Sequence, residues 1–131
     1  MKNKMYLRLD IEKFKGDPDE VAKTIGVKPS SVFRKGDQIG TSKLKCKWNA
    51  LEYRVDANRS YDLEKLVSSL MGKFKDKRKL KKAISLGKAE LVCVLYTSDR
   101  SPVLTLSPAQ IKMLADLKCS FSVDYYLVPI N

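Results

Sequence analysis

The chain has 131 residues, 44% of them hydrophobic, and its 26 Lys and Arg outweigh 15 Asp and Glu to give a formal net charge of +11. This size and composition predict one domain, residues 1–131, with a hydrophobic core of its own, and exclude a disordered chain. No apolar run approaches the roughly 20 residues of a membrane span, and the N-terminus lacks the apolar stretch of a signal peptide. Because histidine is absent, Ser–His–Asp and Cys–His catalysis are excluded.

The first third of the chain predicts a strand, a capped helix and a second, short strand. Apolar and polar residues alternate from 5 to 14, as in a half-buried strand. Asp17 and Pro18 are residue types that begin a helix, and Gly26 is one that ends it. Residues 30–35 predict a short strand, which a glycine-containing loop follows over 36–42.

A longer strand is predicted over residues 43–55. Its alternation places one set of mainly apolar side chains on one face, which predicts core positions, and a row of lysines on the other. The first set is Leu44, Cys46, Trp48 and Ala50, and the second is Lys43, Lys45 and Lys47.

The second half of the chain predicts helices that alternate with two strands. Asp62 is expected to cap a helix whose apolar stripe breaks at Arg78, so two consecutive helices or one kinked helix are predicted up to about residue 86. The most apolar segment, 89–97, predicts a central strand. Ser107 is expected to begin a further helix through a capping box, and residues 120–128 predict the last strand.

The predicted order of elements is therefore β-α-β-β-α-β-α-β. It predicts an α+β domain in which the helices pack on one face of a mixed, mostly antiparallel sheet. A variant of the ferredoxin-like fold is expected, because that fold arranges its strands around two crossover helices.

The three cysteines, Cys46, Cys93 and Cys119, are far apart in the sequence. An odd number without close spacing argues against a disulfide framework and against a zinc site. We expect three reduced thiols and, from them, a cytoplasmic protein.

Several short motifs, taken in order, are similar to those of a known family. They are Asp17-Pro18-Asp19-Glu20-Val21, Ile25-Gly26-Val27-Lys28-Pro29-Ser30, Arg34-Lys35-Gly36-Asp37, Trp48, Val92-Cys93-Val94-Leu95-Tyr96-Thr97-Ser98-Asp99 and Leu104-Thr105-Leu106-Ser107-Pro108. From Tyr6 to Val128 the chain resembles the bacterial family called domain of unknown function 4279. The resemblance implies a small cytoplasmic α+β domain of bacteria and their phages, and it supplies no catalytic residues. Since members are commonly acidic or near neutral, the positive charge would be a specialisation of this chain.

The excess of positive charge is concentrated in the middle of the sequence. Residues 28–88 contain 17 Lys and Arg against 6 Asp and Glu, whereas the remainder is balanced at 9 against 9. Seven of the ten residues from Lys73 to Lys82 are basic. On a helix, Lys75, Lys79 and Lys82 would lie near one another, so an acidic macromolecule could run along them.

These observations predict a non-catalytic binding module for an acidic partner. The expected partner is a protein, in the manner of immunity or anti-defence proteins that block an enzyme, and charges at its rim would mainly steer association. The predicted partner-binding residues are Arg34, Lys35, Lys43, Lys45, Lys47, Lys73, Lys75, Lys77, Arg78, Lys79, Lys81 and Lys82. No catalytic residue, metal site, cofactor or membrane contact is predicted.

Two alternatives use the same basic residues. A nucleic-acid-binding protein would contact phosphates through them, although the dominance of Lys over Arg favours unspecific electrostatics. A sensor or enzyme for a phosphorylated small molecule would use Arg34 and Lys35, beside the glycines of 36–42, as anion ligands. The spacing of those glycines is not that of a P-loop.

Overall fold

The computed structural model describes residues 3–57 and 61–130. It shows an α+β domain with one five-stranded mixed sheet and four helices, so the predicted fold class is confirmed. The elements are β1 (Lys4–Phe14), α1 (Pro18–Ile25), β2 (Ser31–Phe33), β3 (Asn49–Asp56), α2 (Leu63–Met71), α3 (Lys77–Ser85), β4 (Lys88–Thr97), α4 (Pro108–Asp116) and β5 (Cys119–Leu127). Among the described residues, no helix has the length and apolar character that a membrane span requires.

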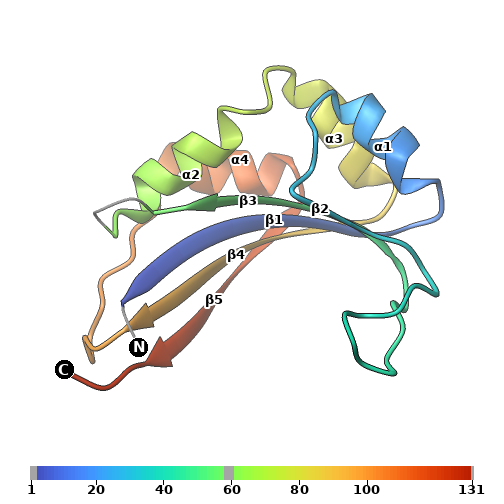
Figure 1. Cartoon of the computed structure of the whole chain (residues 1–131). Coiled ribbons are helices and arrows are strands. Elements are labelled where there is room, and N and C mark those ends of the chain that lie inside the picture. The colour runs from blue at the N-terminus through green and yellow to red at the C-terminus, as the bar shows by residue number, and fades with distance from the viewer. Residues whose placement is uncertain (1–2, 58–60, 131) are drawn as a thin grey trace.

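The sheet has β1 in its middle, in the order β2-β3-β1-β4-β5. β1 runs antiparallel to both of its neighbours, β2 is antiparallel to β3, and β4 and β5 are parallel. All four helices lie on one face of the sheet, and the chain between β2 and β3 projects from the opposite side (Figure 1). The predicted mostly antiparallel pairing and the single helical layer are thus confirmed.

The first four strands interleave as two split β-α-β units. The chain passes through α1 from β1 to β2 with β3 between them, and through α2 and α3 from β3 to β4 with β1 between them. β5 is added beside β4 after α4. The ferredoxin-like variant itself stays a prediction.

The period-two pattern of β1 decides which face of the sheet receives the helices. Leu7, Leu9 and Ile11 are at most 1% exposed, whereas the intervening Arg8 and Asp10 lie on the open face in partial contact with water. The helices bury Val67, Leu70 and Leu80 in the same core. Removal of this apolar surface from water, at roughly 25 cal/mol per Å², is the main term that stabilises the two layers against each other.

Local capping sets the helix boundaries. Asp17 caps α1, and Gly26 ends it at a φ of 82°, in the left-handed region that favours glycine. Ser107 and Gln110 form a complete capping box at α4. Asp76 caps α3, so the segment that precedes β4 contains two helices and not one kinked helix.

The predicted strand over 43–55 is wrong in its first half, because β3 begins at Asn49. The preceding residues, 34–48, form what we call the 34–48 loop. Its backbone bonds across itself, for example from the amide of Gly36 to the carbonyl of Cys46. Because these polar groups are satisfied within the loop, they do not need partners in the sheet.

The same difference overturns the prediction that Trp48 and its neighbours belong to the core. Leu44 is 69% exposed and Trp48 is 37% exposed. Trp48 instead donates from its indole Nε1 to a carboxylate oxygen of Glu12, 3.2 Å away on the open face of β1. The alternation of apolar and polar residues does not distinguish a strand from a loop here, because a loop segment can alternate in the same way.

Gly87, between α3 and β4, touches the backbone of β1 at a bulge. The pairing of β1 with β3 shifts register between Glu12 and Phe14. A Cβ at position 87 would lie 2.3 Å from the carbonyl oxygen of Glu12, and backbone atoms cannot move aside cheaply. We predict that Gly87→Ala lowers the free energy of unfolding by about 1–3 kcal/mol, as measured by urea denaturation.

Gly16→Ala is the matched control for this substitution. A Cβ at position 16 would have its nearest neighbour, a methyl group of Val21, at an ordinary contact distance of 3.8 Å. The free energy of unfolding should stay the same or rise by up to about 1 kcal/mol. Equal losses in the two variants would contradict the close approach at Gly87.

Candidate functional site

The predicted partner-binding residues lie in two parts of the chain. The basic residues of 73–82 belong to the helical layer, on α3 and on the connection before it. The others belong to the 34–48 loop: Arg34, Lys35, Lys43, Lys45 and Lys47. In Figure 1 the helices lie above the sheet and the chain between β2 and β3 extends below it, although Arg34, at the start of that chain, reaches α1 through its ion pair with Asp19.

Four lysines converge near the end of α1. Lys73 and Lys75 of the α2–α3 connection, Lys79 of α3 and Lys28 line a hollow of about 480 Å³. Asp76, the N-cap of α3, is the carboxylate among the residues that line it. Lys28 was not among the predicted residues, because only the packing of α1 against α3 brings it here.

A second depression, of about 370 Å³, lies between α3 and α4, and we call it the α3–α4 groove. Its apolar part consists of Ala109, Met113 and Leu117. Its charged part consists of Lys77, Arg78, Lys81, Lys112 and Asp116. Four cations thus border an apolar strip, with one carboxylate among them. No sequence pattern linked Lys112 to α3, since Lys112 is 31 residues beyond Lys81 in the chain.

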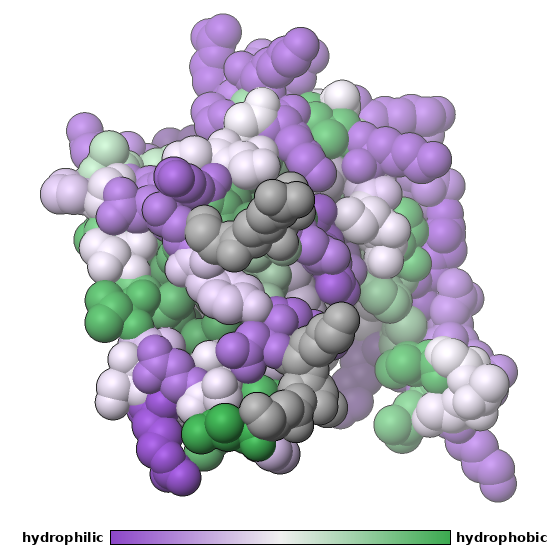
Figure 2. Space-filling view, turned by 60° about the vertical axis from the view of Figure 1, so that its left-hand side comes forward, coloured by the Kyte–Doolittle hydropathy of each residue, from purple (hydrophilic) through white to green (hydrophobic). Residues whose placement is uncertain are grey.

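Most of these cations have no carboxylate within ion-pair distance in the part of the chain that the structure describes. Arg78 lies 3.9 Å from Asp76, but its side chain is 96% exposed, so the pair contributes little. Lys77 has a structural role, because its Nζ donates to the carbonyls of Met71 and Phe74 at the end of α2. In Figure 2, hydrophilic side chains project from the top of the molecule, at the height of the α2–α3 connection.

Of the two residues predicted as anion ligands, Arg34 has its side chain paired with another group. The guanidinium of Arg34 donates to a carboxylate oxygen of Asp19 at 2.6 Å. The backbone amide of Lys35 donates to the side-chain oxygen of Asn49 at 2.8 Å. Since Arg34 already has a carboxylate partner, this arrangement weakens the hypothesis that Arg34 and Lys35 together hold a phosphate.

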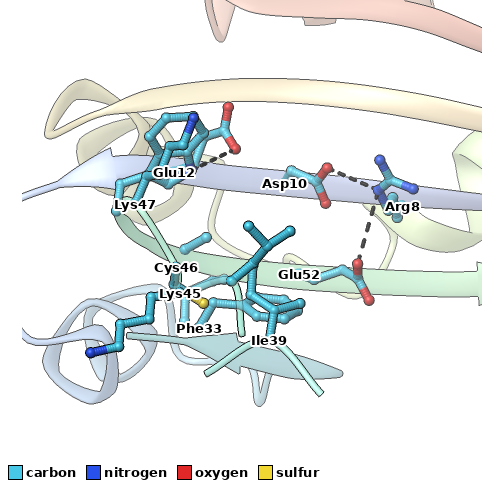
Figure 3. Close-up of a pocket in the computed structure, with 13 residues that line it drawn as sticks. Arg8, Asp10, Glu12, Phe33, Ile39, Lys45, Cys46, Lys47 and Glu52 are labelled. Carbon is cyan, nitrogen blue, oxygen red and sulfur yellow. Dashed lines mark hydrogen bonds and ion pairs between the residues drawn. The ribbon is translucent and has the colours of Figure 1, made fainter. Parts of the chain in front are cut away.

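On the open face, the 34–48 loop and the sheet enclose a cleft of about 440 Å³, which we call the sheet-face cleft (Figure 3). Its apolar lining includes Phe33, Ile39, Leu44, Cys46 and Trp48. The four largest of these side chains are between 37% and 69% exposed. The volume falls within the range of small-molecule sites, roughly 300–1,000 Å³.

The sheet supplies the charged side of this cleft. Asp10 and Glu12 of β1 and Glu52 of β3 lie along it, with Arg8 beside them. The Nε of Arg8 is 2.9 Å from Asp10 and 3.9 Å from Glu52 (Figure 3). Burial raises the pKa of Asp10, although Arg8 opposes this effect. The cleft therefore joins an apolar wall to partly buried carboxylates.

The sequence alone does not reveal the sheet-face cleft. The alternation of β1 does place Arg8, Asp10 and Glu12 on one face, but nothing in the sequence indicates that the 34–48 loop folds against it. The pattern that could have suggested the cleft is the presence of Ile39 and Leu44 in a segment that is otherwise polar. Large apolar residues in a loop commonly cover or form a binding surface.

One thiol and three carboxylates line the sheet-face cleft. Within residues 3–57 and 61–130, no three side chains of His, Cys, Asp or Glu lie close enough to hold a metal ion. Cys46 lines the cleft, but the chain has no histidine to activate its thiol. The carboxylates are held by Arg8 and by the indole of Trp48.

The model of one protein family, described as domain of unknown function (DUF4279), matches residues 3–128. The chain belongs to the DUF4279 family. No curated protein and no solved structure is significantly similar to it. The resemblance inferred from the motifs is therefore confirmed, and the DUF4279 description names no activity.

The cysteines of this DUF4279 protein differ in burial, and all three are free. Burial raises the pKa of Cys93 to about 11 and that of Cys119 to about 12, whereas Cys46 is half-buried in the cleft. Because the thiolate is the reactive form, we predict that a thiol reagent at neutral pH labels Cys46 first in the native protein. Mass spectrometry should show one fast label per native chain and three labels after unfolding.

Cys46→Ser should remove the fast label and leave the slow ones unchanged. If Cys93 or Cys119 were labelled as fast as Cys46 in the native protein, their burial would be contradicted. The cytoplasmic location, which was inferred from the cysteines, stays a prediction.

Proposed function

We propose that this DUF4279 protein is a non-catalytic binding module that docks an acidic protein segment on its helical face. The observation that carries the proposal is the α3–α4 groove, in which cations border an apolar strip. Such a site suits an amphipathic segment with carboxylates beside its apolar side chains, a common form of helix-in-groove recognition.

The composition of the groove favours a protein over a nucleic acid. A protein segment would place apolar side chains against Met113 and Leu117 and carboxylates near Arg78, Lys81 and Lys112. Phosphates would use these cations but would leave the apolar strip uncovered. Lysines also outnumber arginines here, and Lys lacks the planar fork that suits bidentate contacts to phosphates and bases.

The other lysines of the helical layer support the proposal through long-range attraction. Lys28, Lys73, Lys75 and Lys79 gather around the hollow beside α1. Their field would raise the association rate of an acidic partner even without direct contact. That the partner is an enzyme which this module blocks, in the manner of immunity or anti-defence proteins, stays a prediction.

The test uses a fluorescent peptide with leucines at helical spacing and glutamates at the other positions. We predict that the protein binds it more tightly than a peptide of equal charge in which serine replaces leucine. The triple variant Arg78→Glu, Lys81→Glu, Lys112→Glu should weaken binding about tenfold or more, equivalent to ~1.4 kcal/mol. Fluorescence anisotropy at physiological salt measures both effects. Lys77 is left unchanged because it bonds to the end of α2.

The matched control is Lys35→Glu, Lys43→Glu, Lys45→Glu, which makes the same change in net charge on the 34–48 loop. It should alter the affinity about twofold or less, since these residues belong to the 34–48 loop and do not line the α3–α4 groove. Equal losses of affinity in both triple variants would show that net charge alone causes the effect. They would contradict the α3–α4 groove as the binding site. Tighter binding to duplex DNA than to the peptide, with a steep salt dependence, would favour the nucleic-acid alternative.

A further inference from the structure

We propose that the sheet-face cleft is a binding site for a small organic cation with an apolar body, such as an aryl-alkyl ammonium compound. The cleft lies on the opposite side of the sheet from the α3–α4 groove. This inference therefore stands apart from the proposed docking function and can fail or succeed without it.

The apolar wall of the cleft supplies the first argument. Ile39, Leu44 and Trp48 of the 34–48 loop and Phe33 at the end of β2 expose large apolar surfaces that face the same space. Grouped apolar side chains at a surface commonly mark a ligand groove or an interaction site. A ring or a branched chain in the cleft would remove part of their surface from water.

The charges of the sheet supply the second argument. Asp10 of β1 stands directly opposite Glu52 of β3 and Glu90 of β4. Neighbouring strands are about 4.8 Å apart, and like charges directly opposite each other destabilise a sheet. Among the described residues, Arg8 is the cation that lies within ion-pair distance of both Asp10 and Glu52. An added ammonium group would offset the remaining negative charge.

Position within the cleft decides which charges a ligand meets. The side chains of Asp10 and Glu52 are only 19% and 24% exposed, so an ammonium beside them would interact more strongly than in open water. Lys45 and Lys47 also line the cleft, but both are exposed. Figure 3 shows Lys45 extending away from the carboxylates of the sheet.

The chemistry of the lining selects one class of occupant. The carboxylates call for a cationic group, and the apolar wall beside them calls for an apolar body. An anion placed beside the partly buried Asp10 and Glu52 would be repelled, whereas the two lysines that line the cleft are exposed. A neutral apolar molecule would lie against these carboxylates without pairing with them and would hinder their hydration. The cleft volume of about 440 Å³ leaves room for an apolar body beside the ammonium group.

Trp48 provides a direct reporter, because it lines the cleft and is the single tryptophan of the chain. The probe is 2-phenylethylammonium chloride, which does not absorb where tryptophan is selectively excited. We expect a saturable change in Trp48 emission as the probe is added to the native protein. 2-Phenylethanol, which lacks the positive charge, should bind at least about tenfold more weakly than the ammonium probe. 3-Phenylpropanoate, which carries a negative charge instead, should cause no saturable change in Trp48 emission.

Two variants test the role of the carboxylates. Asp10→Asn and Glu52→Gln should each weaken binding of the ammonium probe about fivefold to tenfold and leave that of 2-phenylethanol nearly unchanged. The matched control is Asp124→Asn, which removes one charge from the open face of β5 outside the residues that line the cleft. It should bind the probe as the unmodified protein does.

The Asp10→Asn variant is expected to fold. Burial raises the pKa of Asp10, so ionisation of this carboxyl lowers the stability of the folded chain as the pH rises above its unfolded-state pKa. Replacement by the neutral amide removes that cost. Circular dichroism and the urea midpoint of each variant verify the fold independently of the probe.

The rate of Cys46 labelling gives a second measurement, since Cys46 also lines the cleft. The ammonium probe should slow this labelling at the concentrations that change Trp48 emission. Absence of a saturable change in emission would overturn the proposal. So would equal affinity for 2-phenylethanol and the ammonium probe, or equal effects of Asp10→Asn, Glu52→Gln and Asp124→Asn in folded proteins.

Discussion

The central strand β1 pairs on both of its edges but buries only one of its two faces, and the rest of the structure depends on this constraint. Leu7, Leu9 and Ile11 face the helices, so the helices must gather on that side to cover them. Every crossover between strands therefore passes over the same face. The alternate residues of β1 are left on the other face, where Arg8 pairs with Glu52 of β3 and Glu12 accepts a hydrogen bond from Trp48 of the 34–48 loop.

This arrangement divides the charge of the protein between two surfaces. The lysines of the α2–α3 region lie on the helical side, where few carboxylates accompany them. The open face carries Asp10, Glu12, Glu52 and Glu90 near one another. The sheet and its apolar core separate the two surfaces, and surface charges far apart are screened by salt. The net charge of +11 therefore does not describe either surface by itself.

The two surfaces also suit different kinds of ligand. The α3–α4 groove is an open depression between two helices with cations at its border, which fits a segment of a macromolecule. The sheet-face cleft lies between a loop and a sheet, with exposed apolar side chains on one side and partly buried carboxylates on the other, which fits a small molecule. The DUF4279 family description names no activity.

The sequence by itself determined the α+β class, the order of the elements and most of their boundaries, because alternation, apolar stripes and caps such as Asp17, Asp62 and Ser107 act between residues close in the chain. It also located the excess of lysine. The tertiary structure decided that residues 43–48 leave the sheet and that Lys28 and Lys112 join the lysines of α3. It also decided that the 34–48 loop forms a cleft with β1. These features depend on contacts between segments distant in the chain, for which local periodicity contains no information.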